Sequence, residues 1–182
     1  MTRHIGGRVH RSRYADFYTI LMTIDTQTLD PKRDPMGAAI LDYLTTGRAK
    51  TLTVMSSMFD DDEMPVDYLF RTTDSMPPLE LKALEMTRGT TLDVGAGAGC
   101  HALALQQHGV SVKAIDVSPL SCDAMRRRGI ADVECINLFG PRLGGGFDTI
   151  LMLMNGTGIA GKMSGLGGLL RRVASLLAPG GQ

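Results

Sequence analysis

A carboxylate followed by three glycines is the stretch of this 182-residue sequence that could do chemistry. Asp93 precedes Gly95, Gly97 and Gly99, which gives the spacing D-x-G-x-G-x-G. Glycine lets the backbone turn sharply and lets a ligand approach the main chain, and the free N–H groups that begin a following helix attract polar ligands. The pattern predicts a nucleotide-binding turn with Asp93, Gly95, Ala96, Gly97 and Gly99 as site residues.

The identity of the expected nucleotide depends on which glycines are taken as the motif. Gly97, Gly99 and Ala102 fit the G-x-G-x-x-G/A fingerprint of NAD-binding domains, with the acidic Asp116 about 20 residues further on. Asp93 favours a different ligand, because a carboxylate repels a pyrophosphate but accepts hydrogen bonds readily from an ammonium group. A nucleoside that carries an amino acid therefore fits better than NAD.

A strand, a turn and a helix must position these residues. The apolar run at 92–94 predicts the strand, and the Ala/Leu-rich run at 102–105 indicates the helix. The segment 147–154 is nearly continuously apolar, as a parallel strand buried on both faces must be. Further strands are expected at 111–116 and 132–137, and further helices at 36–46, 78–86, 119–128 and 164–177. These elements indicate one domain of the α/β class.

Polar residues follow several of the predicted strands. Asp116 ends the strand 111–116, where a carboxylate can bind both hydroxyls of a ribose; Ser118 fits the alternative role of helix cap better. Asn155 and Gly156 follow the strand 147–154, at the edge where such sheets bind ligands. A turn-capping role for Asn155 is an equally good interpretation.

Four motifs in order, LDVGAGAG, AIDVSP, FDTILMLMNGTG and LLAPGGQ, resemble those of class I S-adenosylmethionine (SAM)-dependent methyltransferases over about residues 36–182. The resemblance implies a Rossmann-like, mostly parallel sheet with helices on both faces. It also implies SAM as cofactor and methyl transfer to a small-molecule or protein acceptor. Val117, next to Asp116, joins the expected cofactor-binding residues.

The resemblance also implies an acidic residue after the strand 132–137, where it reads the adenine amino group. This sequence departs from that pattern, since the position is held by Asn137. An amide oxygen can accept from the amino group, but without charge. The sequence assigns no catalytic residue; His101 is a candidate base, although a histidine in a first helical turn is more often a packing or capping residue.

The family's sheet has seven strands, and this sequence supplies four of the central run. We therefore expect a chain truncated at its C-terminus, with an incomplete SAM-binding domain over 77–182 and a cap segment over 36–76. Without a neighbour, the strand 147–154 would be a long apolar edge that favours self-association. A non-catalytic SAM-binding protein and, less favoured, an NAD-dependent oxidoreductase stay as alternative functions. Within the cap segment, Tyr68 and Arg71 could cover the cofactor.

Composition narrows the remaining classes of function and partner. Lys plus Arg equals Asp plus Glu at 19 each, so no overall field favours nucleic acid or an anionic membrane. Three cysteines without C-x-x-C spacing and four scattered histidines predict a reduced, cytoplasmic protein without a metal site. No apolar run is long enough for a membrane helix. The basic residues in 1–21 allow a nucleic-acid arm or a transit peptide, but a flexible or spurious extension over 1–35 is preferred.

Overall fold

The computed structural model describes residues 28–48, 51–55 and 60–182. The basic segment 1–21, and most of the extension predicted over 1–35, lie outside these residues.

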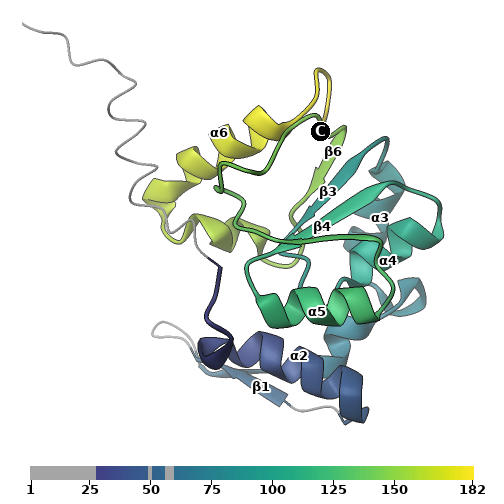
Figure 1. The fold of residues 1–182 in the computed structure, drawn as a ribbon, viewed down its shortest axis with the longest axis vertical. Helices are drawn as coiled ribbons and strands as arrows, with labels where there is room; N and C mark the ends of the chain where they lie inside the picture. The colour runs from purple at the N-terminus through teal and green to yellow at the C-terminus, as the bar shows by residue number, and fades with distance from the viewer. Residues whose placement is uncertain (1–27, 49–50, 56–59) are drawn as a thin grey trace, which may run out of the picture.

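A four-stranded parallel sheet forms the centre of the molecule (Figure 1). Its strand order is β5-β4-β3-β6. The strands are β3 (Thr91–Val94), β4 (Val112–Asp116), β5 (Asp132–Cys135) and β6 (Thr149–Leu151). All residues of β3 are buried, which explains why the sequence before the glycines is apolar. The chain winds outward from β3 to β5 and then returns to the other side of β3, so β3 and β6 flank the switch point where such sheets bind ligands.

Helices cover both faces of this sheet, as a Rossmann-like fold requires. Leu92 and Val94 of β3 pack in one core cluster with Leu169 and Leu176 of α6 (Leu166–Leu176). The opposite core cluster joins Ala114 of β4 to α4 (Cys100–Gln107) and α5 (Pro119–Arg127). Figure 1 shows α6 above the sheet and α5 below it. The α/β, Rossmann-like fold predicted from the sequence is confirmed.

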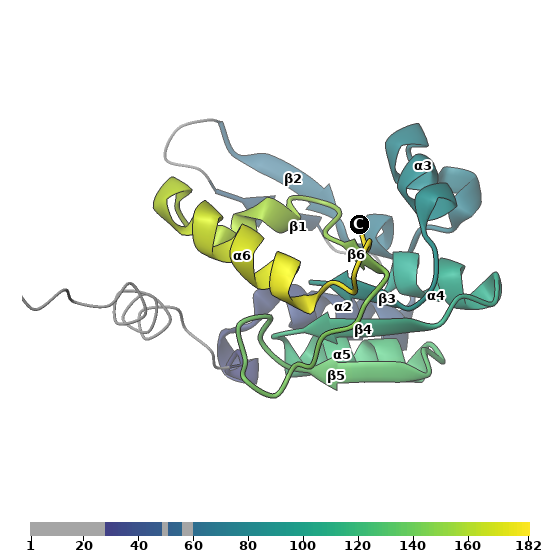
Figure 2. The same cartoon turned by 90° about the horizontal axis from the view of Figure 1, so that it is seen from above.

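The segment before β3 packs against the sheet-bearing part. Helix α2 (Pro35–Thr46) lies beside α5, and Ile40 is fully buried in a core cluster that includes Ala98 and Ala124. The hairpin β1 (Thr51–Val54) and β2 (Asp62–Pro65) is antiparallel and separate from the parallel sheet (Figure 2). Two short 3₁₀ helices, η2 (Val66–Phe70) and η3 (Thr73–Ser75), then lead to α3 (Pro78–Met86).

Several predicted helix boundaries are confirmed by their caps. Ser118 is the N-cap of α5: its hydroxyl accepts from the Ser121 N–H at 2.9 Å, and Pro119 occupies the first turn. Gly47 ends α2 in the left-handed conformation, with φ of 67°. The acidic run 60–63 is exposed, and its last two residues begin β2.

The strand predicted over 147–154 is wrong in length, because β6 covers only Thr149–Leu151. Its neighbour β3 ends at Val94 and the chain turns away at Gly95, so β6 has no partner beyond that point. The outer edge of β6 is also partly paired. Its backbone bonds are Ala178 N–H to Phe147 O, Gln182 N–H to Asp148 O and Ile150 N–H to Gln182 O, at 2.8, 2.9 and 2.9 Å. The expected long, unpaired edge is therefore not found; self-association stays a prediction.

Candidate functional site

Asp93 lies in β3, one residue before the strand ends, and its side chain is directed to the face that α4 covers. It is 2% exposed, and among the described residues its Oδ2 atom has no hydrogen-bond partner. Burial raises the pKa of Asp93 to about 6, the charge of Asp116 adds to the rise, and His101 and a backbone hydrogen bond from Ala102 oppose it. The site thus contains a buried carboxylate oxygen ready to accept a donor.

The glycine turn follows immediately. Gly95, Gly97 and Gly99 all have left-handed backbones, with φ of 69°, 57° and 78°. A Cβ atom at Gly97 would meet no protein atom within 4 Å, whereas one at Gly99 would lie 2.9 Å from Met125 Cγ. Gly97 therefore borders open space that a ligand can fill, and Gly99 permits close packing against α5. The buried Ala96 lies between Gly95 and Gly97 and joins the opposite core cluster.

Asp116, at the end of β4, is joined directly to this turn. Its Oδ2 accepts the Gly97 N–H at 2.8 Å, and its Oδ1 accepts the Ser118 N–H at 2.9 Å. Burial raises the pKa of Asp116; the backbone hydrogen bonds lower it and the charge of Asp34 raises it further. Each carboxylate oxygen has a second acceptor position that a ribose hydroxyl could use, and the ribose contact stays a prediction.

The chain before α2 crosses the exit of β4, which the sequence did not predict. The Leu29 N–H donates to the Val117 carbonyl at 2.8 Å, and the Ser118 hydroxyl donates to Asp34 Oδ2. Asp34 is 3% exposed and also caps α2 through the Gly37 N–H at 2.8 Å. Residues 29–34 therefore lie against the predicted cofactor residue Val117.

Asn137 lies two residues beyond β5, at the same edge of the sheet. Its Oδ1 accepts the Phe139 N–H at 3.0 Å, which closes a local turn. Arg172 of α6 supports this turn, because its guanidinium donates to the carbonyls of Leu138, Gly140 and Leu143 at 2.8–3.1 Å. The contact of Asn137 with adenine stays a prediction.

Asn155 and Gly156 follow β6 through a turn with unusual backbone angles. Met154 and Asn155 are both left-handed, with φ of 52° and 64°, and Asn155 is exposed. A Cβ atom at Gly156 would lie 2.8 Å from Met152 Cβ, so this position needs glycine. The following 3₁₀ helix η4 (Gly156–Ala160) places Ile159 Cδ1 3.7 Å from the Cβ position of Gly95. The exit of β6 thus reaches the glycine turn.

A buried charge cluster, missed by the sequence analysis, lies next to the first turn of α4. Glu80 Oε2 accepts from Arg71 Nε and Nη2 at 3.0 and 2.6 Å, and His101 Nε2 lies 2.9 Å away. Although burial raises the pKa of Glu80, the bonds from His101 and Arg71 lower it below its usual value. Burial lowers the pKa of His101, but contacts with Cys100, Asp93 and Glu80 raise it to about 9.

This cluster changes how two residues are interpreted. A protonated His101 cannot act as a base at neutral pH, so the packing role considered for it is favoured. Arg71 lies 4.3 Å from the Tyr68 ring centroid, and its Nη2 lies 2.8 Å from Met154 Sδ. The segment predicted to cover the cofactor is therefore attached both to α4 and to the exit of β6.

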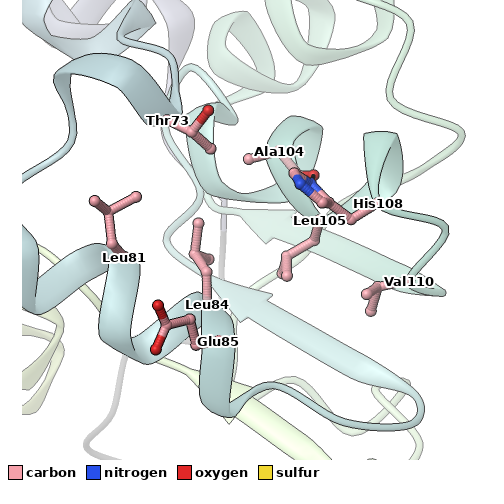
Figure 3. Close-up of a pocket in the computed structure, with 8 residues that line it drawn as sticks. All are labelled: Thr73, Leu81, Leu84, Glu85, Ala104, Leu105, His108 and Val110. Atoms are coloured by element: carbon pink, nitrogen blue, oxygen red, sulfur yellow. Dashed lines mark hydrogen bonds between the residues drawn. The ribbon is translucent and has the colours of Figure 1, made fainter.

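Two further hollows lie among the described residues. One, of about 440 Å³, lies beside the residues that follow β6, between Thr157 and Leu166. The other, of about 330 Å³, separates α3 from α4 (Figure 3). Figure 3 shows Leu84 of α3 facing Leu105 of α4. Neither is lined by a residue of the predicted cofactor set.

Within residues 28–48, 51–55 and 60–182, no group of three or more His, Cys, Asp or Glu side chains could hold a metal ion. In the same residues no helix is both long and apolar enough to cross a membrane.

No protein-family model and no curated protein sequence matches the chain. A solved structure, a SAM-dependent methyltransferase from Bacteroides fragilis in complex with S-adenosylhomocysteine (SAH), is 52% identical with a TM-score of 0.82. The match covers 87% of this chain and 66% of that one, so the chain spans less than two thirds of its relative's length.

Two other solved structures are more distantly similar. A sugar N-methyltransferase from Streptoalloteichus is 18% identical with a TM-score of 0.47, over 100% of this chain and 56% of that one. A SAM-dependent methyltransferase from Thiobacillus denitrificans in complex with SAH is 25% identical with a TM-score of 0.44. This match covers 58% of this chain and 46% of that one. Its fold, its motifs and its identity with the Bacteroides protein place the chain among the class I SAM-dependent methyltransferases.

Proposed function

We propose that the chain binds SAM in the turn after β3 and transfers its methyl group to a small-molecule or protein acceptor. The unpaired, buried Oδ2 of Asp93 is the observation that carries the proposal. A buried carboxylate oxygen without a donor is unfavourable in the free protein. The ammonium group of a bound amino acid would supply the missing donor, and the open face of Gly97 leaves room for the ligand beside it.

The other predicted residues lie around this point, at the carboxyl ends of the four strands. Asp116 would bind the ribose hydroxyls with Val117 beside it, and Asn137 would bind the adenine amino group. Gly95, Ala96 and Gly99 shape the turn, while Asn155 and Gly156 border the acceptor side. Tyr68 and Arg71 would close the site from the segment before α3. The SAH complex of the 52% identical Bacteroides protein supports SAM as the cofactor.

The proposed chemistry asks mainly for binding and orientation. SAM, when bound, supplies a methyl group that its sulfonium already activates. The protein's own part is to hold the amino-acid end at Asp93 and to admit the acceptor in line with the methyl group. His101 keeps its proton in the bond to Glu80, so we assign it no proton-transfer step.

Isothermal titration calorimetry with SAH and with NAD tests the cofactor. We expect SAH to bind and NAD not to bind. Asp93→Ala should weaken the binding of SAH at least tenfold, because a charge-assisted contact is lost. Asp61→Asn is the control, because it removes the same charge at an exposed position. Binding of NAD in place of SAH would contradict the proposal.

Labelled SAM incubated with a panel of small-molecule and protein acceptors tests the transfer. Appearance of label in an acceptor supports the proposed activity. Tight SAH binding without transfer to any acceptor favours the non-catalytic SAM-binding alternative.

A further inference from the structure

Three consecutive arginines end α5, two in its last turn and Arg128 as its C-cap, and they have three different environments. Positive charges at the C-terminal end of a helix complement its dipole, but these three side chains make different contacts. Arg126 donates to the Val133 carbonyl at 3.1 Å, and Arg127 forms an exposed salt bridge with Asp123 at 2.7 Å. Arg128 instead turns back toward the glycine turn.

Arg128 touches two separate parts of the site. Its Nη1 donates to the carbonyl of Ala98, the residue between Gly97 and Gly99. Its guanidinium carbon lies 4.7 Å from the ring centroid of Phe70, the last residue of η2. Burial lowers the pKa of Arg128, in agreement with a charge that packs against the protein.

The bond to Ala98 completes the fixation of the glycine turn. Asp116 holds the Gly97 N–H, and the Gly99 N–H donates to the Ala96 carbonyl at 2.7 Å. Arg128 holds the Ala98 carbonyl between them. Because the carbonyl of one residue and the N–H of the next share a rigid peptide plane, a bond to Ala98 O also orients the Gly99 N–H.

The second contact of Arg128, with Phe70, lies in segment 66–71, which would close the site. Residue Arg71, next to Phe70, reaches His101 and Met154, which border the turn and the exit of β6. Phe70 also contacts α2, since its ring centroid lies 4.7 Å from that of Tyr43. A shift of Arg128 with the turn would therefore also displace segment 66–71.

We infer that Arg128 is a positioning residue that couples the glycine turn to segment 66–71, so that a ligand in the turn and closure of the segment stabilise each other. The inference rests on the proposed function. A planar guanidinium can donate to a carbonyl and stack on an aromatic ring at once, whereas a lysine ammonium at the same position serves one contact at a time.

The test compares Arg128→Met with the matched control Arg127→Met, from the same helical turn. SAH affinity is measured by calorimetry, and hydrogen exchange of the amides at 66–71 is followed with and without SAH. In the wild type and in Arg127→Met we expect SAH to slow exchange in the segment. In Arg128→Met we expect roughly tenfold weaker SAH binding and loss of that slowing.

Phe70→Leu and Arg128→Lys keep the test decisive if Arg128→Met does not fold. Phe70→Leu should keep the bond to Ala98 but lose the SAH-dependent slowing in 66–71. Arg128→Lys should restore SAH affinity in part without restoring the slowing. Wild-type SAH affinity with normal slowing in Phe70→Leu or Arg128→Met overturns the inference. Failure of the wild type to bind SAH contradicts the proposed function instead.

Discussion

The ends of β3 and β4 each carry an aspartate at the same edge of the sheet, but the fold surrounds the two carboxylates differently. Asp116 accepts two backbone N–H groups, one on each oxygen. Asp93 is almost completely buried and has an oxygen without a partner among the described residues. Only the second arrangement leaves a strong acceptor unsatisfied in the free protein.

The difference separates two uses of the same side chain. A carboxylate that binds backbone groups stabilises the turn whether or not a ligand is present. A buried carboxylate without a donor destabilises the free protein, and a cationic ligand offsets that effect when it binds. Asp116 is therefore a structural residue first and a ligand contact second, whereas Asp93 is suited chiefly to a ligand.

The largest effect is expected from filling the space beside Asp93. Gly97→Val introduces a β-branched side chain at φ of 57° into the open face, and should weaken SAH binding by roughly 100-fold or more. Gly109→Val is a matched control, because Gly109 has φ of 77° and also no atom within 4 Å of its Cβ position. The control should lose stability similarly but keep its SAH affinity. Calorimetry on both variants measures the contrast, and equal affinities would place the ligand elsewhere.

Acid should weaken SAH binding, because it protonates Asp93. Its pKa of about 6 predicts that SAH affinity falls roughly tenfold per pH unit below that value, because a protonated carboxyl cannot pair with an ammonium group. The folded-state pKa lies above the ordinary value of 3.8, so the contribution of Asp93 to stability is greatest below about pH 4 and is lost as pH rises through 6. Affinity titrations between pH 4.5 and 8 measure the first effect; a flat profile would contradict it.

Asp116→Asn should lower stability and affinity together. An amide can accept from only one of the two N–H groups that Asp116 now binds, so we expect a loss of about 1–2 kcal/mol in the free energy of unfolding. SAH affinity should fall by about tenfold, since both the turn and the proposed ribose contact are changed. Urea unfolding and calorimetry measure the two quantities. Weaker binding with unchanged stability would mean that Asp116 is not structural.

The smallest expected change is at the end of β5. Asn137→Asp can keep the turn bond to the Phe139 N–H and adds a charged acceptor, so we expect SAH binding to tighten by a few-fold. Binding of S-inosylhomocysteine, which lacks the adenine amino group, is the matched comparison and should not tighten. Equal gains for both ligands would separate Asn137 from the amino group.

Local sequence signals predicted most of the fold. The glycines after β3, Ser118 and Pro119 at the start of α5, and Gly47 at the end of α2 each act through their own backbone geometry, which a short stretch of sequence records. The length of β6 could not be predicted in this way. Its sequence continues apolar through Met154, but its last pair with β3 is Leu151 with Asp93, just before the chain turns away at Gly95.

Contacts between distant residues account for what the sequence missed. Arg71, Glu80 and His101 come from separate elements, and the only local hint was charge inside otherwise apolar segments. Arg128 cannot be told from its two neighbours in the sequence, and only its contacts with the distant Ala98 and Phe70 distinguish it. The pairing of Asp116 with Gly97 has the same origin, so the sequence could not separate the roles of the two aspartates.

Asp93→Asn tests this distinction most directly, because it removes the charge with little change in shape. At pH 7.5 the free energy of unfolding of the free protein should rise by about 3 kcal/mol, the scale set by the rise in the pKa of Asp93 from 3.8 to about 6. SAH affinity, measured on the same samples, should fall at least tenfold. Opposite changes in stability and affinity are the predicted result. A variant that is less stable and binds SAH as tightly as the wild type would show that Asp93 serves the fold and not the ligand.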